Sequence, residues 1–207
     1  QHADRMVFDL TQFEFLKDES PETVNPSLWR QAQLNAQHHG LFEVVDGIYQ
    51  VRSFDIANMT LVRGETGWII IDPLLTIETA AASLALANKH LGERPVVGVI
   101  YTHSHVDHYG GVFGVTSREA VDAGNCRIIA PEGFLEEAVS ENGTAGPIMM
   151  RRAIHQFGVL LPHGPTGKVN TGLGVDMPIG HRSLLAPTET VSETGAELEI
   201  GGVRVVF

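Results

Sequence analysis

Cysteine is nearly absent from this sequence, which holds one, Cys126, among its 207 residues. A single cysteine excludes an internal disulfide framework and a zinc module built on cysteine ligands. Cys126 opens the apolar run 126–130, so we expect it to be a small buried hydrophobic residue. Cysteine usage therefore leaves the cellular compartment open. The chain begins at Gln1 rather than Met, which allows for a removed export signal, and we expect a periplasmic or secreted protein, with a cytoplasmic one still open.

Long apolar runs are missing too: no stretch of about 18 apolar residues occurs, which excludes a membrane-spanning helix. Positive charge is scarce, with 14 Lys and Arg against 25 Asp and Glu, for a formal net charge of −11. Without a basic stripe to displace counterions, the chain is not expected to bind nucleic acid. Its overall field also repels anions at a distance, so an anionic substrate requires local cations or metal ions.

The remaining composition, 43% hydrophobic and 19% charged, is that of a globular protein with one sizeable core. Residues 1–41 differ from the rest and predict an N-terminal arm: a short amphipathic segment at 9–16, then a helix over 28–38 with Pro26 as a breaker before it and Gly40 at its end. Residues 42–207 predict the first part of a larger catalytic domain, because the chain stops inside its last strand.

Within 42–207, β-type runs and helical patterns alternate. We expect strands at 47–51, 59–63, 67–72, 96–101 and 126–130, helices at 76–91, 117–123, within 133–140 and at 147–157, a long connector at 158–183, and a hairpin over 197–207 that turns at Gly201-Gly202. Strands that alternate with helices indicate a layered α/β fold with helices on the outer faces of the sheet.

The stretch Thr-His-Ser-His-Val-Asp-His-Tyr-Gly-Gly, residues 102–111, follows the apolar run 96–101 directly. Polar loops at the carboxyl ends of strands are where α/β folds place their sites. His103 and His105 are two residues apart, so on an extended segment both imidazoles point the same way. Asp107 and His108 then lead into the Gly110-Gly111 bend. The alternative is a solvated polar loop that is rich in histidine by chance.

Imidazole and carboxylate ligands suit zinc, with iron and manganese as competitors. Four ligands this close together are too crowded for one tetrahedral site. A site for two ions is easier to form, with His103 and His105 binding one ion and Asp107 and His108 binding the other. Each ion still needs further ligands from elsewhere in the protein.

This stretch resembles the metallo-β-lactamase superfamily signature T-H-x-H-x-D-H-x-G-G. The resemblance implies a metallo-β-lactamase-like αββα sandwich, of which this chain is the N-terminal portion, and two zinc ions. It places His103 and His105 on the first metal and Asp107 and His108 on the second, with Asp107 also orienting the metal-bound water. Asp72, which ends the run Ile69-Ile70-Ile71-Asp72, matches the strand-terminal Asp of the family and would support the metal loop from outside the ligand shell.

Further blocks resemble the alkylsulfatase branch, the SDS-hydrolase-like alkyl and aryl sulfatases. They lie at 23–35, 39–44, 47–52, 55–60, 172–174 and 187–188. The resemblance implies a dinuclear zinc alkylsulfatase, a sulfuric ester hydrolase in which a metal-activated water splits an alkyl sulfate into alcohol and inorganic sulfate. It also implies a homodimer, formed through regions beyond Phe207, where the remaining metal ligands and the sulfate-binding residues lie as well.

Two alternatives stay open at this point. One is another hydrolase of the same fold, acting on a lactam, thioester or phosphodiester. The other is a non-catalytic metal-binding fragment. Within the favoured function, nothing in the sequence decides between primary and secondary alkyl sulfates, or between S–O and C–O cleavage.

The other polar residues receive structural interpretations. His38, His39 and His90 lie at expected helix ends, where imidazoles favour the exposed carbonyls. His155, His163 and His181 are isolated in the sequence, and a place beside a pocket is open only for His163 and His181. Arg151 and Arg152 are expected to form a helix-surface pair. Four glutamates are expected on a solvated helix face: Glu132, Glu136, Glu137 and Glu141.

Overall fold

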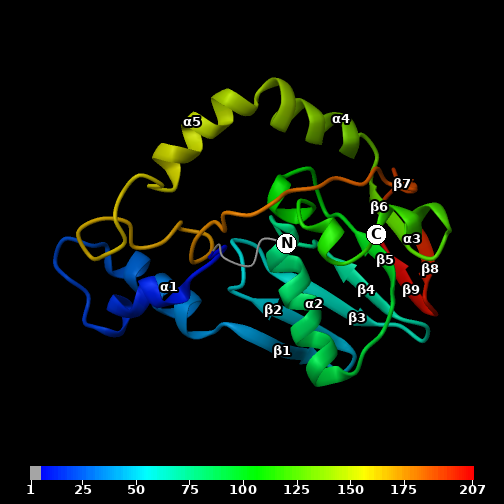
Figure 1. Cartoon of the computed structure of the whole chain (residues 1–207), viewed down its shortest axis with the longest axis horizontal. Coiled ribbons are helices and arrows are strands. Elements are labelled where there is room, and N and C mark those ends of the chain that lie inside the picture. The colour runs from blue at the N-terminus through cyan, green and yellow to red at the C-terminus, as the bar shows by residue number, and fades with distance from the viewer. Residues whose placement is uncertain (1–5) are drawn as a thin grey trace.

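A seven-stranded mixed sheet organises the structure, a computed structural model that describes residues 6–207 (Figure 1). The strands lie side by side in sequence order: antiparallel from β1 to β4, then parallel from β4 to β7. Their bounds are β1 (Gly40–Val45), β2 (Ile48–Arg52), β3 (Met59–Arg63), β4 (Trp68–Ile71), β5 (Val96–Ile100), β6 (Arg127–Pro131) and β7 (Glu189–Val191).

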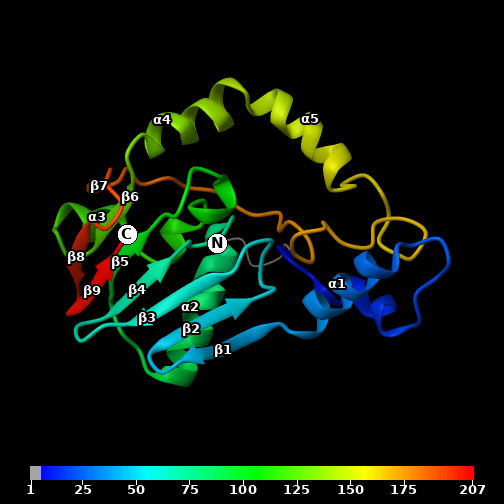
Figure 2. The same cartoon turned by 180° about the vertical axis from the view of Figure 1, so that it is seen from behind.

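Helix α2 (Ile77–Leu91) covers one face of this sheet, in front of the strands in Figure 1 and behind them in Figure 2. The Thr76 side chain caps its start by accepting a hydrogen bond from the Thr79 amide, and Gly92 ends it at a positive φ. Its small buried residues, such as Ala80 and Ala87, allow close approach to the sheet. The largest buried cluster fills this interface.

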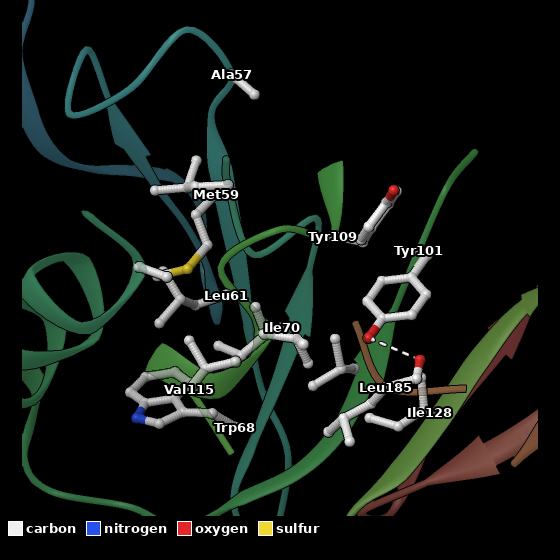
Figure 3. Packing of buried hydrophobic residues seen from close by; sticks show 14 of the residues in the cluster. Ala57, Met59, Leu61, Trp68, Ile70, Tyr101, Tyr109, Val115, Ile128 and Leu185 are labelled. Atoms are coloured by element: carbon white, nitrogen blue, oxygen red, sulfur yellow. Dashed lines mark hydrogen bonds between the residues drawn. The ribbon is translucent and has the colours of Figure 1, made fainter. Parts of the chain in front are cut away.

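Figure 3 shows part of that cluster. Met59, Leu61 and Trp68 from β3 and β4 are fully buried, and Ile128 from β6 belongs to the same cluster (Figure 3). The Tyr101 hydroxyl, at the end of β5, donates to the Leu185 carbonyl at 3.4 Å, the hydrogen bond drawn as a dashed line (Figure 3). This bond ties the connector that follows residue 157 to the carboxyl ends of the parallel strands.

A hairpin of β8 (Glu197–Ile200) and β9 (Val203–Val206) packs on the opposite face. Ile200 joins Ile69, Ile100 and Ile129 in a second buried cluster. β4 is therefore buried on both sides, as expected for an unbroken apolar run in the parallel part of a sheet.

The chain beyond β5 supplies short helices and an arch (Figures 1 and 2). α4 and α5 stand above the body of the molecule, joined by a π-helical turn, η4. The bounds are η2 (Val106–His108), η3 (Val112–Gly114), α3 (Arg118–Asp122), α4 (Phe134–Val139), η4 (Ser140–Thr144) and α5 (Gly146–Gln156).

The N-terminal segment forms a 3-10 helix, η1 (Leu10–Lys17), and α1 (Pro26–Gln37). Phe13 and Trp29 from these helices form a third buried cluster, with Val169 and Val175 from the connector. Among the helices of residues 6–207, none combines the length and the hydropathy that a bilayer crossing requires.

Most predicted elements are confirmed within two residues of their expected ends, and β3 matches its predicted range. The role of Pro26 was predicted wrongly: it is the first residue of α1, with Asn25 as the cap, because proline suits the first helical turn, where its missing amide has no partner. β1, the short 3-10 turns η2 and η3, η4 and the three-residue β7 were not predicted, and the irregular connector runs to residue 188 instead of 183.

Candidate metal centre

The predicted metal loop begins where β5 ends, next to the end of β4. Because these strands are parallel neighbours, Asp72 and Thr102 meet at one edge of the sheet. The Thr102 amide donates to Asp72 Oδ1 at 2.8 Å, and the Thr102 hydroxyl donates to Asp72 Oδ2 at 2.7 Å. Asp72 has a φ of 56°, a left-handed conformation that aspartate adopts more readily than most residues. This carboxylate fastens the start of the loop to the neighbouring strand.

Three imidazoles of the loop lie together. The ring centroids of His103 and His105 are 4.7 Å apart, and those of His103 and His108 are 4.0 Å apart. His103 Nε2 lies 3.1 Å from His105 Nδ1. Asp107 joins the group through Oδ2, which is 3.2 Å from His108 Nε2. The four residues predicted as metal ligands therefore form one cluster, and His108 Nδ1 lies 2.8 Å from Asp72 Oδ2 on its other side.

Two glycines let the loop turn back beneath this cluster. A Cβ on Gly110 would lie 2.2 Å from the Leu75 carbonyl oxygen, and one on Gly111 would lie 2.2 Å from that of Pro73. Only glycine permits such an approach to another backbone. Because the two backbones are this close, the Gly111 amide donates a hydrogen bond to the Leu74 carbonyl at 2.9 Å. The loop is thereby bound to the segment between β4 and α2.

The charges within the cluster depend on one another. Burial by itself lowers the pKa of His108, but hydrogen bonds to Asp107 and Asp72 outweigh burial and raise this pKa to about 9. Burial raises the pKa of Asp107, yet the contact with His108 leaves it below its usual value. The pKa of His103 is lowered, first by burial and then by the neighbouring imidazoles. Asp72, Asp107 and His108 thus form a compact ionic group.

The donor chemistry of the cluster fits a metal ion, since neutral imidazoles and carboxylates are the ligands that zinc takes when cysteine is absent. Within residues 6–207, however, no group of three or more His, Cys, Asp or Glu side chains is arranged so that it could hold a metal ion. The four residues instead form one chain of contacts, in which His103 meets both other imidazoles and His108 meets Asp107.

A cavity of about 1090 Å³ opens beside the cluster, and His105, Asp107 and His108 form part of its wall. Most of the rest of the wall comes from α5, η4 and the connector, and Ile56 and Leu75 contribute from the segments after β2 and β4. Its apolar side chains include Met149, Met150, Phe157, Leu173, Met177 and Leu184. A site with this lining receives an apolar group next to the histidines.

Glu141 belongs to this site, contrary to the sequence analysis. Its Oε1 lies 3.7 Å from His105 Nε2, and its side chain is 26% exposed. It was expected on a solvated face with Glu132, Glu136 and Glu137, which are indeed exposed. The cause is η4: a π-helical turn shifts the register, so Glu141 leaves the exposed face of α4.

The remaining histidines have structural contacts. His39 Nδ1 lies 3.1 Å from the Ala36 carbonyl oxygen at the end of α1, which confirms its expected helix-end position. His163 lies 2.8 Å from Asp176, and His181 lies 2.5 Å from Glu78. None of these three is part of the cavity wall. Arg152, expected on the helix surface with Arg151, does line the cavity.

Asp55 is a buried carboxyl group that the sequence analysis did not single out. Its Oδ2 accepts hydrogen bonds from the Thr79 hydroxyl at 2.6 Å and the Leu75 amide at 3.2 Å. Burial raises its pKa to about 7, which the hydrogen bonds only partly oppose. No local signal reveals it, because its burial depends on α2, more than twenty residues away in the sequence.

Comparison with known proteins places these features in context. A family model described as the metallo-beta-lactamase superfamily matches residues 52–207. The chain is 50% identical over 204 residues to a linear primary-alkylsulfatase of Pseudomonas sp., a match that covers 98% of this chain and 30% of that protein. It is likewise 50% identical over 203 residues to the alkyl/aryl-sulfatase BDS1 of Saccharomyces cerevisiae, covering 98% of this chain and 31% of the relative.

Among solved structures, the stereoselective inverting sec-alkylsulfatase Pisa1 from Pseudomonas sp. matches with a TM-score of 0.93 and 43% identity, over 99% of this chain and 32% of that one. This match confirms the predicted fold class. The chain spans about a third of the length of the relatives it matches.

Proposed function

Since the chain belongs to the metallo-beta-lactamase superfamily, we propose that it forms the N-terminal part of a metal-dependent hydrolase that cleaves alkyl sulfate esters into an alcohol and inorganic sulfate. Residues 42–207 are the first part of the catalytic domain in this proposal, and residues 1–41 are an arm. The identity to alkylsulfatases along almost the whole chain supports the substrate class.

One structural observation carries the proposal: three members of the histidine cluster, His105, Asp107 and His108, form part of the wall of an apolar cavity. Hydrolysis of a sulfate ester on a long carbon chain needs both features side by side. The cavity receives the alkyl chain, and each buried CH₂ group contributes about 0.8 kcal/mol to binding. The ester group is then held at the polar end of the cavity, near the histidines.

In this proposal His103 and His105 hold one zinc ion, and Asp107 and His108 hold a second. When bound, zinc acidifies water and polarises an ester oxygen. Asp72 accepts a hydrogen bond from Nδ1–H of His108, which fixes the tautomer and turns Nε2 toward Asp107, the other proposed ligand of that ion, whose Oδ2 lies 3.2 Å away. Asp107 orients the attacking water. The remaining ligands and a homodimer interface belong to parts of the protein outside residues 1–207.

The test uses the full-length protein with dodecyl sulfate as substrate. We expect release of sulfate that is lost on chelation and restored by zinc. His105→Ala should abolish both turnover and stoichiometric zinc binding, because it removes a ligand. His155→Ala is the matched control, since His155 is exposed and does not line the cavity.

Two results would contradict the proposal. One is a protein that is inert toward alkyl sulfates and hydrolyses a β-lactam or a thioester. The other is a His105→Ala variant that keeps full zinc stoichiometry and activity.

A further inference from the structure

Two arginines line the cavity beside the histidine cluster: Arg152 on α5 and Arg182 on the connector. Their presence stands out because the chain carries a net charge of −11, which repels an anionic substrate at long range. Within residues 6–207 neither arginine forms an ion pair with a carboxylate. Both arginines are exposed residues that line the cavity, so they can meet a ligand there.

The backbone on both sides of Arg182 is fixed. On one side, the Ile77 amide donates to the His181 carbonyl at 2.8 Å, and the His181 amide donates to Glu78 Oε2 at 2.9 Å. These bonds attach the connector to the start of α2.

On the other side, the Ser183 amide donates to the Gly110 carbonyl at 2.7 Å, and the Ser183 hydroxyl donates to the same oxygen at 2.9 Å. That hydroxyl also accepts a hydrogen bond from the Phe113 amide at 3.2 Å. Gly110 lies two residues after His108. The connector is therefore bound directly to the metal loop, and Arg182 extends from a position that is set by this loop.

An arginine held in this way is suited to recognise an oxyanion. The planar guanidinium presents parallel N–H donors that match two oxygens of a sulfate group, and its charge does not depend on pH. A fixed backbone lowers the entropy lost when the contact forms. Arg152 extends from α5, in an arch that meets the metal loop through side chains, Asn142 on Tyr109 and Glu141 on His105, so it adds charge with less geometric control.

We propose that Arg182 binds the anionic sulfate group of the substrate and thereby makes the site selective for sulfate esters over neutral esters with the same alkyl chain. This inference rests on the proposed function, whose substrate class it uses. Arg182 acts as a binding and specificity residue, in addition to the sulfate-binding residues expected beyond Phe207, while the metal ligands serve the chemistry.

The experiment compares Arg182→Ala, Arg182→Lys and the control Arg151→Ala in the full-length protein. Arg151 is next to Arg152 on α5 but does not line the cavity. With octyl sulfate we expect Arg182→Ala to raise KM by about 10- to 100-fold, the range for loss of a hydrogen bond to a charged group, with a smaller change in kcat. Arg182→Lys should recover part of the loss, and Arg151→Ala should match the wild type.

A binding measurement on the metal-free protein separates recognition of sulfate from turnover. Arg182→Ala should weaken binding of octyl sulfate and leave binding of octyl glucoside, an uncharged ligand with the same chain, unchanged. Unchanged octyl glucoside binding also shows that the variant is folded. Equal octyl sulfate affinity and KM in Arg182→Ala and Arg151→Ala would overturn the inference. A wild-type protein that binds octyl sulfate through Arg182 but does not hydrolyse it would instead overturn the proposed function.

Discussion

Asp72 connects more parts of the candidate site than any one of the proposed ligands. It follows β4, bonds to the amide and hydroxyl of Thr102 after β5, and contacts His108 within the cluster. Its left-handed backbone turns the chain so that the carboxylate faces the neighbouring strand. One side chain thus holds the start of the loop and the orientation of an imidazole, and its contacts are those of a residue that supports ligands without being one.

Asp55 gives a prediction about pH and stability. Its pKa is about 7 in the folded chain and near 3.8 when exposed, so the folded state holds the proton more tightly. As the pH rises from about 4 to about 7, the unfolded chain releases this proton first, and the contribution of Asp55 to stability falls by about 4 kcal/mol in total. Asp55→Asn removes that dependence.

The measurement is the free energy of unfolding by urea at several pH values, in wild type, Asp55→Asn and the exposed control Asp122→Asn. The difference between Asp55→Asn and wild type should grow in favour of the variant from pH 4 to pH 7 and then remain constant. The control should run parallel to wild type. A constant difference for Asp55→Asn across this range would contradict a raised pKa.

At this scale the sequence predicts what lies close along the chain. His103, His105, Asp107 and His108 form one cluster, as their spacing suggested, because a short loop after a buried strand has few ways to arrange them. Arg182 and Glu141 reach the same cavity from distant elements. Nothing in their immediate neighbours in the sequence indicates this, since their positions follow from tertiary packing.

Among the elements, those with local start and stop signals were predictable. Thr76 and Gly92 delimit α2, and Ser117 caps α3 by accepting from the Ala120 amide. β7 carries no such signal: it is a strand because it pairs with β6 at the edge of the sheet. η4 depends on the packing of the arch, where the Asn142 side chain donates to the Tyr109 hydroxyl at 3.0 Å. The hydrophobic periodicity of the sequence does not predict such tertiary contacts.

The glycine bend after His108 gives the second prediction. A Cβ at residue 111 would lie 2.2 Å from the Pro73 oxygen and 2.5 Å from the Thr76 oxygen, both backbone atoms that cannot turn aside. Gly111→Ala should destabilise the protein by about 3 kcal/mol or more, at or beyond the upper end of ordinary overpacking. It should also weaken the zinc binding proposed for residues 103–108, because the loop must move away from α2.

Gly146→Ala is the control. Gly146 lies in the first turn of α5, and the atom nearest to a Cβ there would be the Glu141 carbonyl oxygen, at 4.0 Å. Its unfolding free energy should stay within about 0.5 kcal/mol of wild type or rise. Urea midpoints and a zinc titration check both variants. Equal urea midpoints for Gly111→Ala and Gly146→Ala would contradict this prediction, because they would show that the bend accommodates a methyl group.

On the scale of the whole molecule, the N-terminal segment supports the far wall of the cavity. The Gln31 side chain donates to the Gly172 carbonyl at 3.0 Å, and the Asn35 side chain donates to that of Leu173 at 3.1 Å. Leu173 lines the cavity. The residues before β1 therefore take part in shaping the candidate site, although they lie outside the span of the family match.

A buried ionic group holds the same wall together. Lys168 is 5% exposed and pairs with Asp176, which also lies 2.8 Å from His163 Nε2 and accepts the Met177 amide at 2.8 Å. His163 in turn packs edge-on against Phe13, with ring centroids 4.9 Å apart. No sequence pattern groups these residues, because each is isolated along the chain and only the folded connector brings them together.

The third prediction follows from this burial. Asp176→Asn leaves Lys168 buried without its carboxylate and should cost about 3–5 kcal/mol of unfolding free energy. Adding Lys168→Met should restore part of this loss, because the double variant buries no unpaired charge, and the coupling should reach about 1–3 kcal/mol. Arg204→Met, which breaks an exposed pair with Glu197 on the β8–β9 hairpin, should have little effect.

Urea unfolding gives the energies, and limited proteolysis should show faster cleavage within residues 158–185 in Asp176→Asn alone. If the two changes were additive, the group would be a set of independent contacts, and the wall beside Leu173 and Met177 would owe its position to the hydrogen bonds from α1 instead.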